Sequence, residues 1–358
     1  MEFTFPVTYT ENPKTRPADE SKLGFGRTFS DHMFLMNYTE GKGWHDGRIV
    51  PYAPLELDPS CMVLHYAQEV FEGMKAYRWE DGSIHLFRPY ENAKRMQNSN
   101  ERLCMPAVPE ETFVEAIKEL VAVDAEWVPH NPGTSLYIRP FIFATDAHLG
   151  VHASETYLFC IICSPSGSYY PNGMSPVDIY VESRDVRAVR GGTGYTKCGG
   201  NYAASLRAGE AAAKKGYVQV LWLDGVHRKY IDEVGAMNVF FVIDGVVVTP
   251  ELTDGNILPG VTRASCIELL KKWGIPVEER KLSIDEVKEA HAAGKLDEVF
   301  GTGTAAVISP VGELYDEGEV MVINNNEIGA IAHKLYDAIT GFQWGRLEDE
   351  MGWIEKIN

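Results

Sequence analysis

The chain has 358 residues, of which 45% are hydrophobic and 23% charged, so it can form two folded domains with cores of their own. Its formal net charge of −18 disfavours binding to nucleic acid or to an anionic membrane surface. The longest apolar stretches, 157–163 and 239–243, are too short to span a bilayer, and the N-terminal residues lack the pattern of a signal or transit peptide. We therefore expect a cytoplasmic protein with no nucleic-acid or membrane partner.

The cysteine and histidine spacings predict neither a disulfide framework nor a metal site. Cys160 and Cys163 form a C-x-x-C within an apolar run, where strand alternation would point the two thiols to opposite faces. His148 and His152 have the i, i+4 spacing of a helical metal site, but Gly150 lies between them and no carboxylate stands as in HExxH. We expect two core cysteines and no metal.

The first half of the chain predicts an α+β unit with an antiparallel sheet. Residues 82–88 read as a strand, followed by a helix that Pro89 opens. A second helix is predicted over 109–128, and two strands over 135–145 and 156–163.

Residues 164–176, rich in Ser, Pro and Gly, interrupt both periodicities and predict an interdomain loop between domains at 1–163 and 177–358. The second domain should contain a strand, a glycine-rich loop and an Ala-rich helix that ends at Gly216. Further predicted elements are strands at 217–224 and 227–234, a hairpin turning on Asp244-Gly245, and helices at 261–273, 284–293 and 327–340.

Lys197 stands in GGTGYTKCGG, between two glycine pairs at the start of a helix. Glycines let the backbone approach a bulky ligand closely. The segment is not a nucleotide-phosphate loop, because Lys197 follows Thr196 and precedes Cys198. Taken alone, this segment also fits a solvent-exposed loop lysine.

Two other segments favour a ligand site. Glu233 lies among mostly apolar residues of a predicted strand, where a buried carboxylate needs a cationic partner such as a protonated pyridine nitrogen; an edge strand facing water is the alternative. Gly260 precedes a helix that opens with Val261 and Thr262, and such a helix start suits a phosphate, although an ordinary capped helix fits as well.

The segment GTGTAA at 301–306 fits a loose dinucleotide-binding pattern. Pro310 follows shortly, so no long helix begins there and the nicotinamide dehydrogenase interpretation is disfavoured. A loop that donates backbone N–H groups to a carboxylate or phosphate remains open.

Taken together, the segments resemble the branched-chain-amino-acid aminotransferases, a pyridoxal-phosphate (PLP) family of fold type IV. The resemblance covers nearly the whole chain, in the family's order, through these segments: FGRTFSDHM, LHYAQEVFEGMKAYR, LFRPYENAKRM, SLYIRPFIFAT, GGTGYTKCGGNYAASL, EVGAMNVFFV, LPGVTR and FGTGTAAVISPV. It implies two α/β domains with the cofactor, pyridoxal 5'-phosphate, at their interface.

The resemblance also implies residue roles. Lys197 would carry the cofactor covalently, Tyr202 would bond its O3′ and Glu233 would pair with the ring nitrogen. The phosphate would be held by Arg95, Val261, Thr262 and Thr304. The substrate carboxylate would face Thr304 and Ala305, and the side-chain pocket would be formed by Phe25, Tyr66, Phe71, Tyr137 and Tyr169. Leu149 and Val151 would reach the pocket of a neighbouring subunit, which makes a homodimer the expected functional unit.

The implied activity is reversible amino transfer from L-leucine, L-isoleucine or L-valine to 2-oxoglutarate. Arg139 shares a strand face with Tyr137 and would bind the γ-carboxylate of glutamate, unless it pairs with a structural acid. Where mammalian family members carry a redox-active thiol pair, this chain has Ala306 and Ser309, so we expect no thiol switch. The alternatives are a D-amino acid aminotransferase, an aminodeoxychorismate lyase, or a PLP-binding protein without turnover.

Overall fold

The structure, a computed structural model, describes residues 4–170 and 173–357. The chain forms two compact units: Met1–Pro171 with Thr196–Gly199 and Gly341–Asn358, and Asn172–Tyr195 with Gly200–Thr340. The first unit thus includes two segments from later in the chain, Thr196–Gly199 and Gly341–Asn358. Lys197 joins the first unit through the Phe71 N–H and the Ser99 hydroxyl, and the C-terminal strand joins it by pairing with residues 85–87.

The first unit is built on one sheet, in which every pairing of the described strands is antiparallel, as predicted. The strand order is β17-β5-β4-β6-β7-β1-β2, with β3 beside β6. The strands are β1 (His32–Thr39), β2 (Gly43–Pro51), β3 (Glu69–Phe71), β4 (Met74–Arg78), β5 (Ile84–Phe87), β6 (Ser135–Ala144), β7 (Thr156–Ser166) and β17 (Ile354–Lys356).

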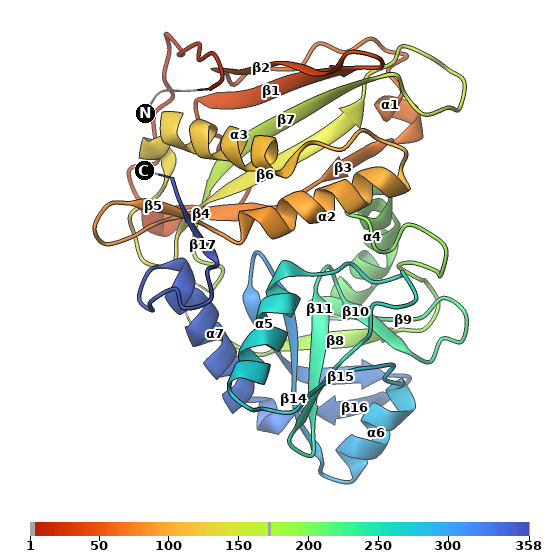
Figure 1. Ribbon diagram of the computed structural model, residues 1–358. Helices are drawn as coiled ribbons and strands as arrows, with labels where there is room; N and C mark the ends of the chain where they lie inside the picture. Colours follow the sequence, from red (N-terminus) through yellow and green to blue (C-terminus); the bar gives the residue numbers. More distant parts are fainter. Residues whose placement is uncertain (1–3, 171–172, 358) are drawn as a thin grey trace. The chain divides into compact units, whose positions relative to one another are not determined.

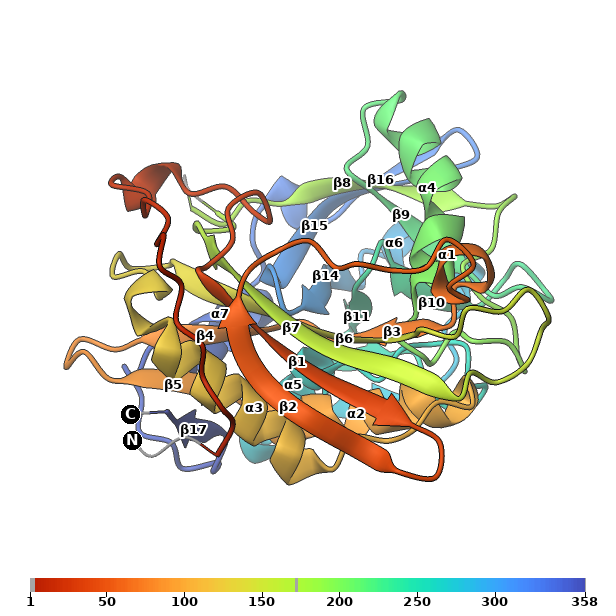
Figure 2. The same ribbon diagram turned by 90° about the horizontal axis from the view of Figure 1, so that it is seen from above.

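Helices α2 (Pro89–Arg102) and α3 (Glu110–Val123) cover one face of this sheet (Figures 1 and 2). The predicted helix 109–128 ends early, and a short 3-10 turn, η2 (Ala125–Trp127), follows. The reason is Asp124, whose carboxylate accepts hydrogen bonds from the His32 backbone N–H at 3.0 Å and is 2.7 Å from His32 Nδ1. Two short helical segments complete the unit, η1 (Glu20–Lys22) and α1 (Val63–Tyr66).

Cys160 and Cys163 confirm the predicted alternation along β7. Cys163 packs in the core beneath α2 and α3, whereas Cys160 joins Met33 and Leu35 in a smaller cluster on the other face. This second face also carries partly buried apolar side chains, namely Val50, Tyr52, Leu55, Phe141, Leu158 and Ile162.

The second unit contains a mixed sheet in the order β10-β9-β8-β15-β14-β11-β12-β13, with β16 beside β15. The pairs β8–β9, β8–β15 and β12–β13 are parallel. The strands are β8 (Val177–Glu182), β9 (Gln219–Leu223), β10 (Ile231–Val234), β11 (Asn238–Ile243), β12 (Val246–Thr249), β13 (Val277–Glu279), β14 (Leu296–Gly303), β15 (Val307–Asp316) and β16 (Glu319–Val322).

The local signals for this unit are confirmed. Asp244 and Gly245 both have positive φ, 51° and 78°, and join β11 to β12. Helices α5 (Val261–Lys272) and α6 (Ile284–Ala292) lie where predicted, and α7 (Ala330–Gln343) is shifted by three residues. Most of α4 (Gly199–Ala213) belongs here, and η3 (Asn324–Asn326) precedes α7. Within the described ranges, no helix has the length and apolar character needed to cross a membrane.

Candidate active site

Lys197 is held by its own backbone in the first unit. Its N–H donates to Ser99 Oγ of α2 at 3.0 Å, and its carbonyl accepts from Phe71 N–H of β3 at 2.9 Å. The amine lies 4.7 Å from the centre of the Phe71 ring. Gly199 N–H donates to the Glu69 carboxylate. These bonds fix the segment on both sides, and Lys197 is half-buried, so it is not an exposed loop lysine.

A buried ion pair lies beside Lys197. Glu72 is fully buried, and its carboxylate accepts two hydrogen bonds from Arg95, from Nε at 2.8 Å and Nη2 at 2.7 Å, and one from Asn92 at 2.9 Å. Burial alone would raise the pKa of Glu72, but the positive charges of Arg95 and Lys197 lower it below 4.5 overall. Glu72 therefore stays ionised at neutral pH, and Nε and Nη2 of Arg95, expected to bind phosphate, are committed to it.

Aromatic rings and Arg139 complete this cluster. Arg139 Nη2 donates to the Tyr137 hydroxyl at 2.9 Å, so the two side chains share a face as predicted. The guanidinium also lies 4.9 Å from the centre of the Phe71 ring, and Phe25 meets Tyr137 edge-on at 4.9 Å. Arg139 Nε is buried with no hydrogen-bond partner among the described residues. Beside Lys197, the cluster therefore offers an apolar wall with Arg139 as a cationic donor.

In the second unit, Glu233 of β10 is 2% exposed, which rules out the water-facing alternative. Its carboxylate lies 3.0 Å from Arg187 Nε and accepts from Leu258 N–H at 2.8 Å. Arg187 is itself fixed by donating to the Asn256 carbonyl at 2.8 Å. Glu233 and Tyr202 line one small pocket, so two predicted cofactor residues come together here.

Helix α5 presents an uncapped N-terminus in the same unit. Its first residue is Val261, and Gly260 before it makes no side-chain cap. A Cβ on Gly260 would collide with the Asn238 amide, which bonds the Leu258 carbonyl at 2.9 Å and so fixes the approach to the helix. Because the first N–H groups of a helix have no partner within it, this end suits an anion. Thr262 lies in the first turn and is mostly buried.

Residues 301–303 end strand β14 and residues 304–306 form the turn to β15, so a strand and not a helix follows the segment. This excludes the dinucleotide-binding context. Thr304 and Ala305 occupy the turn itself.

The comparisons with known proteins identify the family. A family model described as Amino-transferase class IV matches residues 69–314. The chain belongs to the class IV amino-transferase family. This amino-transferase is 57% identical, over 99% of its length and 97% of the relative's, to "Branched-chain-amino-acid aminotransferase 2" of Bacillus subtilis (strain 168).

Two solved structures resemble this class IV amino-transferase along nearly the whole chain. The Escherichia coli branched-chain amino acid aminotransferase has a TM-score of 0.76 at 29% identity, covering 92% of this chain and 99% of its own. The PLP form of the Thermobaculum terrenum branched-chain amino acid aminotransferase has a TM-score of 0.75 at 26% identity, covering 91% and 98%.

Five predicted pocket residues of this class IV amino-transferase have exposed side chains in the single chain: Phe25, Tyr66, Leu149, Val151 and Tyr169. Leu149 and Val151 lie between β6 and β7 and are 74% and 81% exposed. The Tyr66 hydroxyl donates to the Leu149 carbonyl at 2.7 Å, which joins α1 to that loop. No cluster of three metal-binding side chains occurs in the described part of the chain.

Sequence reasoning missed the partners that hold these groups. Glu72 carried a detectable signal, a carboxylate between apolar residues of EVFEGM. Ser99 and Arg187 carried none, because a serine in a helix and an arginine in a loop have many ordinary roles. Their partners lie 98 and 46 positions away in the sequence, at Lys197 and Glu233.

Proposed function

We propose that this class IV amino-transferase is a PLP-dependent branched-chain-amino-acid aminotransferase. It would transfer the amino group of L-leucine, L-isoleucine or L-valine reversibly to 2-oxoglutarate. The observation that carries the proposal is the setting of Lys197, whose amine lies against Phe71 in a cluster with Tyr137 and Arg139. The names of the similar proteins support the same substrate class.

The residues present fit PLP. Glu233 is a buried, oriented carboxylate of the kind that holds a protonated ring nitrogen, and Tyr202 lines the same pocket as a hydrogen-bond donor. The uncapped start of α5 supplies N–H groups for the phosphate. PLP, when bound, supplies an electron-withdrawing ring that stabilises negative charge at the substrate Cα.

Each of these side chains would then have one task. Lys197 would hold the cofactor covalently, and its Nζ would carry the proton that leaves the substrate Cα. Arg187 and the Leu258 N–H would hold the Glu233 carboxylate in place, where it would pair with the ring nitrogen. Thr304 and Ala305 would face the substrate carboxylate.

Substrate choice would follow from the aromatic wall. Phe25, Phe71 and Tyr137 present apolar surface suited to a branched aliphatic side chain, and one methylene there is worth only about 1–3 kcal/mol. Leucine, isoleucine and valine should therefore react at comparable rates. Arg139 supplies the cation that a glutamate γ-carboxylate needs.

We also propose a homodimer as the working unit. The exposed side chains of Leu149 and Val151, and the apolar second face of the first unit's sheet, are surfaces that a second copy would cover. Sedimentation at micromolar concentration should give twice the mass of one chain. The cytoplasmic location stays a prediction, which cell fractionation would test.

The proposed activity is tested by one spectrum. L-Leucine added to the purified yellow holoenzyme should shift the cofactor absorbance as the amino group is transferred, and 2-oxoglutarate should restore it. D-Leucine should cause no shift. Lys197→Ala should abolish overall transamination; near wild-type turnover in that variant, or a response to D-leucine alone, would refute the proposal.

A further inference from the structure

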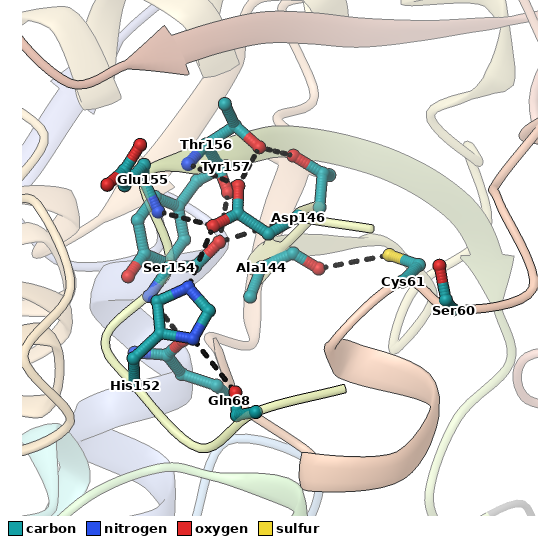
Figure 3. Close-up of polar contacts among 12 residues, drawn as sticks. Ser60, Cys61, Gln68, Ala144, Asp146, His152, Ser154, Glu155, Thr156 and Tyr157 are labelled. Atoms are coloured by element: carbon teal, nitrogen blue, oxygen red, sulfur yellow. Dashed lines mark hydrogen bonds and ion pairs between the residues drawn. The ribbon is translucent and has the colours of Figure 1, made fainter. Parts of the chain in front are cut away.

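The loop between β6 and β7 is anchored by one carboxylate (Figure 3). Asp146 accepts hydrogen bonds from the N–H groups of Glu155 and Thr156 at 2.9 and 3.0 Å, and from the Thr156 hydroxyl at 2.6 Å. The Asp146 carbonyl accepts from Met62 N–H at 2.8 Å, which ties this anchor to α1. Asp146 therefore fixes both ends of the loop that carries Leu149 and Val151.

The exposed His152 side chain bridges two parts of this loop. Its Nε2 lies 3.2 Å from Asp146 Oδ2, and its Nδ1 lies 2.8 Å from the Gly150 carbonyl oxygen. Both partners are acceptors only, since one is a backbone carbonyl and the other a carboxylate. A neutral imidazole has one N–H, so it can satisfy only one of them. Both contacts require the doubly protonated imidazolium.

The charges around His152 agree with this geometry. The backbone carbonyl of Gly150 and the carboxylate of Asp146 raise the pKa of His152 above its ordinary value of 6.5, and Glu155 adds to the effect. The His148 ring, whose centre lies 4.5 Å from that of His152, faces it as well, and a positive charge there would oppose this effect. The pKa of Asp146 itself is lowered, because its hydrogen bonds outweigh its burial.

We propose that His152, as an imidazolium, is a positioning residue that holds Leu149 and Val151 in place. When it loses a proton, one ring nitrogen becomes an acceptor facing an acceptor, and that contact is lost. Asp146 stays ionised through this change. The loop therefore keeps the Asp146 hydrogen bonds at its two ends and loses one of the two contacts made by His152. The effect on catalysis rests on the proposed function and homodimer, together with two roles that the family resemblance implies. Tyr66, which bonds the Leu149 carbonyl, would form part of the side-chain pocket, and Leu149 and Val151 would reach the pocket of a neighbouring subunit.

The direction with pH follows from the raised pKa. The stabilisation by His152 is complete below its ordinary pKa of 6.5 and is lost as pH rises through the higher value in the folded chain. The test is amide hydrogen exchange of the holoenzyme at about pH 6 and about pH 9, expressed as protection factors. Wild-type protection of the His148 and Ser154 amides, which donate to the Ser60 carbonyl and to Gln68 Oε1, should fall by about two- to fivefold, the scale of one exposed ion pair.

Three variants complete this test. His152→Ala should show the low protection at both pH values. His152→Lys, which keeps a positive charge and several donors at about pH 9, should restore it. His45→Gln is the matched control, because it removes another His–Asp contact, that of His45 with Asp46 on β2, and should leave the loop unchanged. Equal wild-type protection at the two pH values would overturn the proposal, as would no difference between His152→Ala and His152→Lys.

A second measurement separates this inference from the proposed function. Between about pH 6 and about pH 9, the KM for L-leucine should rise several-fold in the wild type and by less in His152→Lys. The kcat should change little in either protein. If protection changes as expected while KM does not, the role of His152 in holding the loop stands and the assignment of Leu149 and Val151 to substrate binding fails.

Discussion

Replacing Arg95 with methionine should destabilise the apoprotein by about 3 kcal/mol at pH 7 and by less than about 1 kcal/mol at pH 5. The substitution leaves the fully buried Glu72 carboxylate without its bidentate partner. Such a group escapes its desolvation penalty by taking up a proton. For a carboxyl with an ordinary pKa of 4.5, this costs about 3.4 kcal/mol at pH 7 and about 0.7 kcal/mol at pH 5.

The sign follows from the lowered pKa of Glu72 in the wild type. Its stabilisation is present above pH 4.5 and is lost as pH falls through the folded-state pKa, so the variant and the wild type converge in acid. The nearby positive charge of Lys197 remains and limits the loss. Leaving the charge unpaired and ionised would cost about 3–5 kcal/mol, so protonation is the cheaper outcome at or below pH 7.

Urea unfolding followed by tryptophan fluorescence at the two pH values measures this difference. The double variant Glu72→Gln with Arg95→Met contains no buried charge at these positions, so its loss should be the same at pH 5 and pH 7. Lys94→Met is the matched control on the same helix, since it removes the exposed pair of Lys94 with Glu91, worth about 0–1 kcal/mol. A loss for Arg95→Met that does not change with pH would refute the reasoning.

Three further outcomes are expected. Arg139→Met should raise the KM for glutamate and 2-oxoglutarate, by about 2–5 kcal/mol in binding, and leave the leucine half-reaction nearly unchanged; equal losses in stopped-flow would make Arg139 structural. Asp232→Asn should stabilise the protein more at pH 7 than at pH 5, by about 2 kcal/mol in urea unfolding, because burial and the negative charge of Glu233 raise the pKa of Asp232 to about 7. Mild peroxide should oxidise the exposed Cys104, seen by mass spectrometry, without loss of activity; inactivation that dithiothreitol reverses and Cys198→Ser prevents would contradict this.

Local signals in the sequence predicted local structure well. The hairpin at Asp244-Gly245 and the start of α6, which the Ser283 side chain caps, follow from turn and capping chemistry that involves only a few neighbouring residues. The helix predicted to reach residue 128 is shorter because of a long-range contact. The Asp124 carboxylate binds His32, which lies 92 positions earlier in the sequence. No periodicity within the helix could have indicated that partner.

The candidate site shows the same contrast between local signals and long-range contacts. Its reactive groups could be named from motifs and from family resemblance, whereas the groups that hold them could not. Arg187 reaches Glu233 only because a strand and a loop far apart in the sequence meet in the fold. The parallel pairs β8–β9 and β8–β15 are also long-range features, and the sequence indicated strands there without their order.

Gly73 has a consequence for the natural variation of this chain. A Cβ at that position would collide with the Tyr137 hydroxyl, the oxygen that accepts from Arg139. Positions 73 and 137 should therefore covary among homologues, with alanine at 73 tolerated only where 137 is phenylalanine or smaller. In a library that randomises both positions, selection for growth on glutamate as the amino donor should retain the glycine–tyrosine pair. Selection for growth on leucine as the amino donor should also recover other residue pairs.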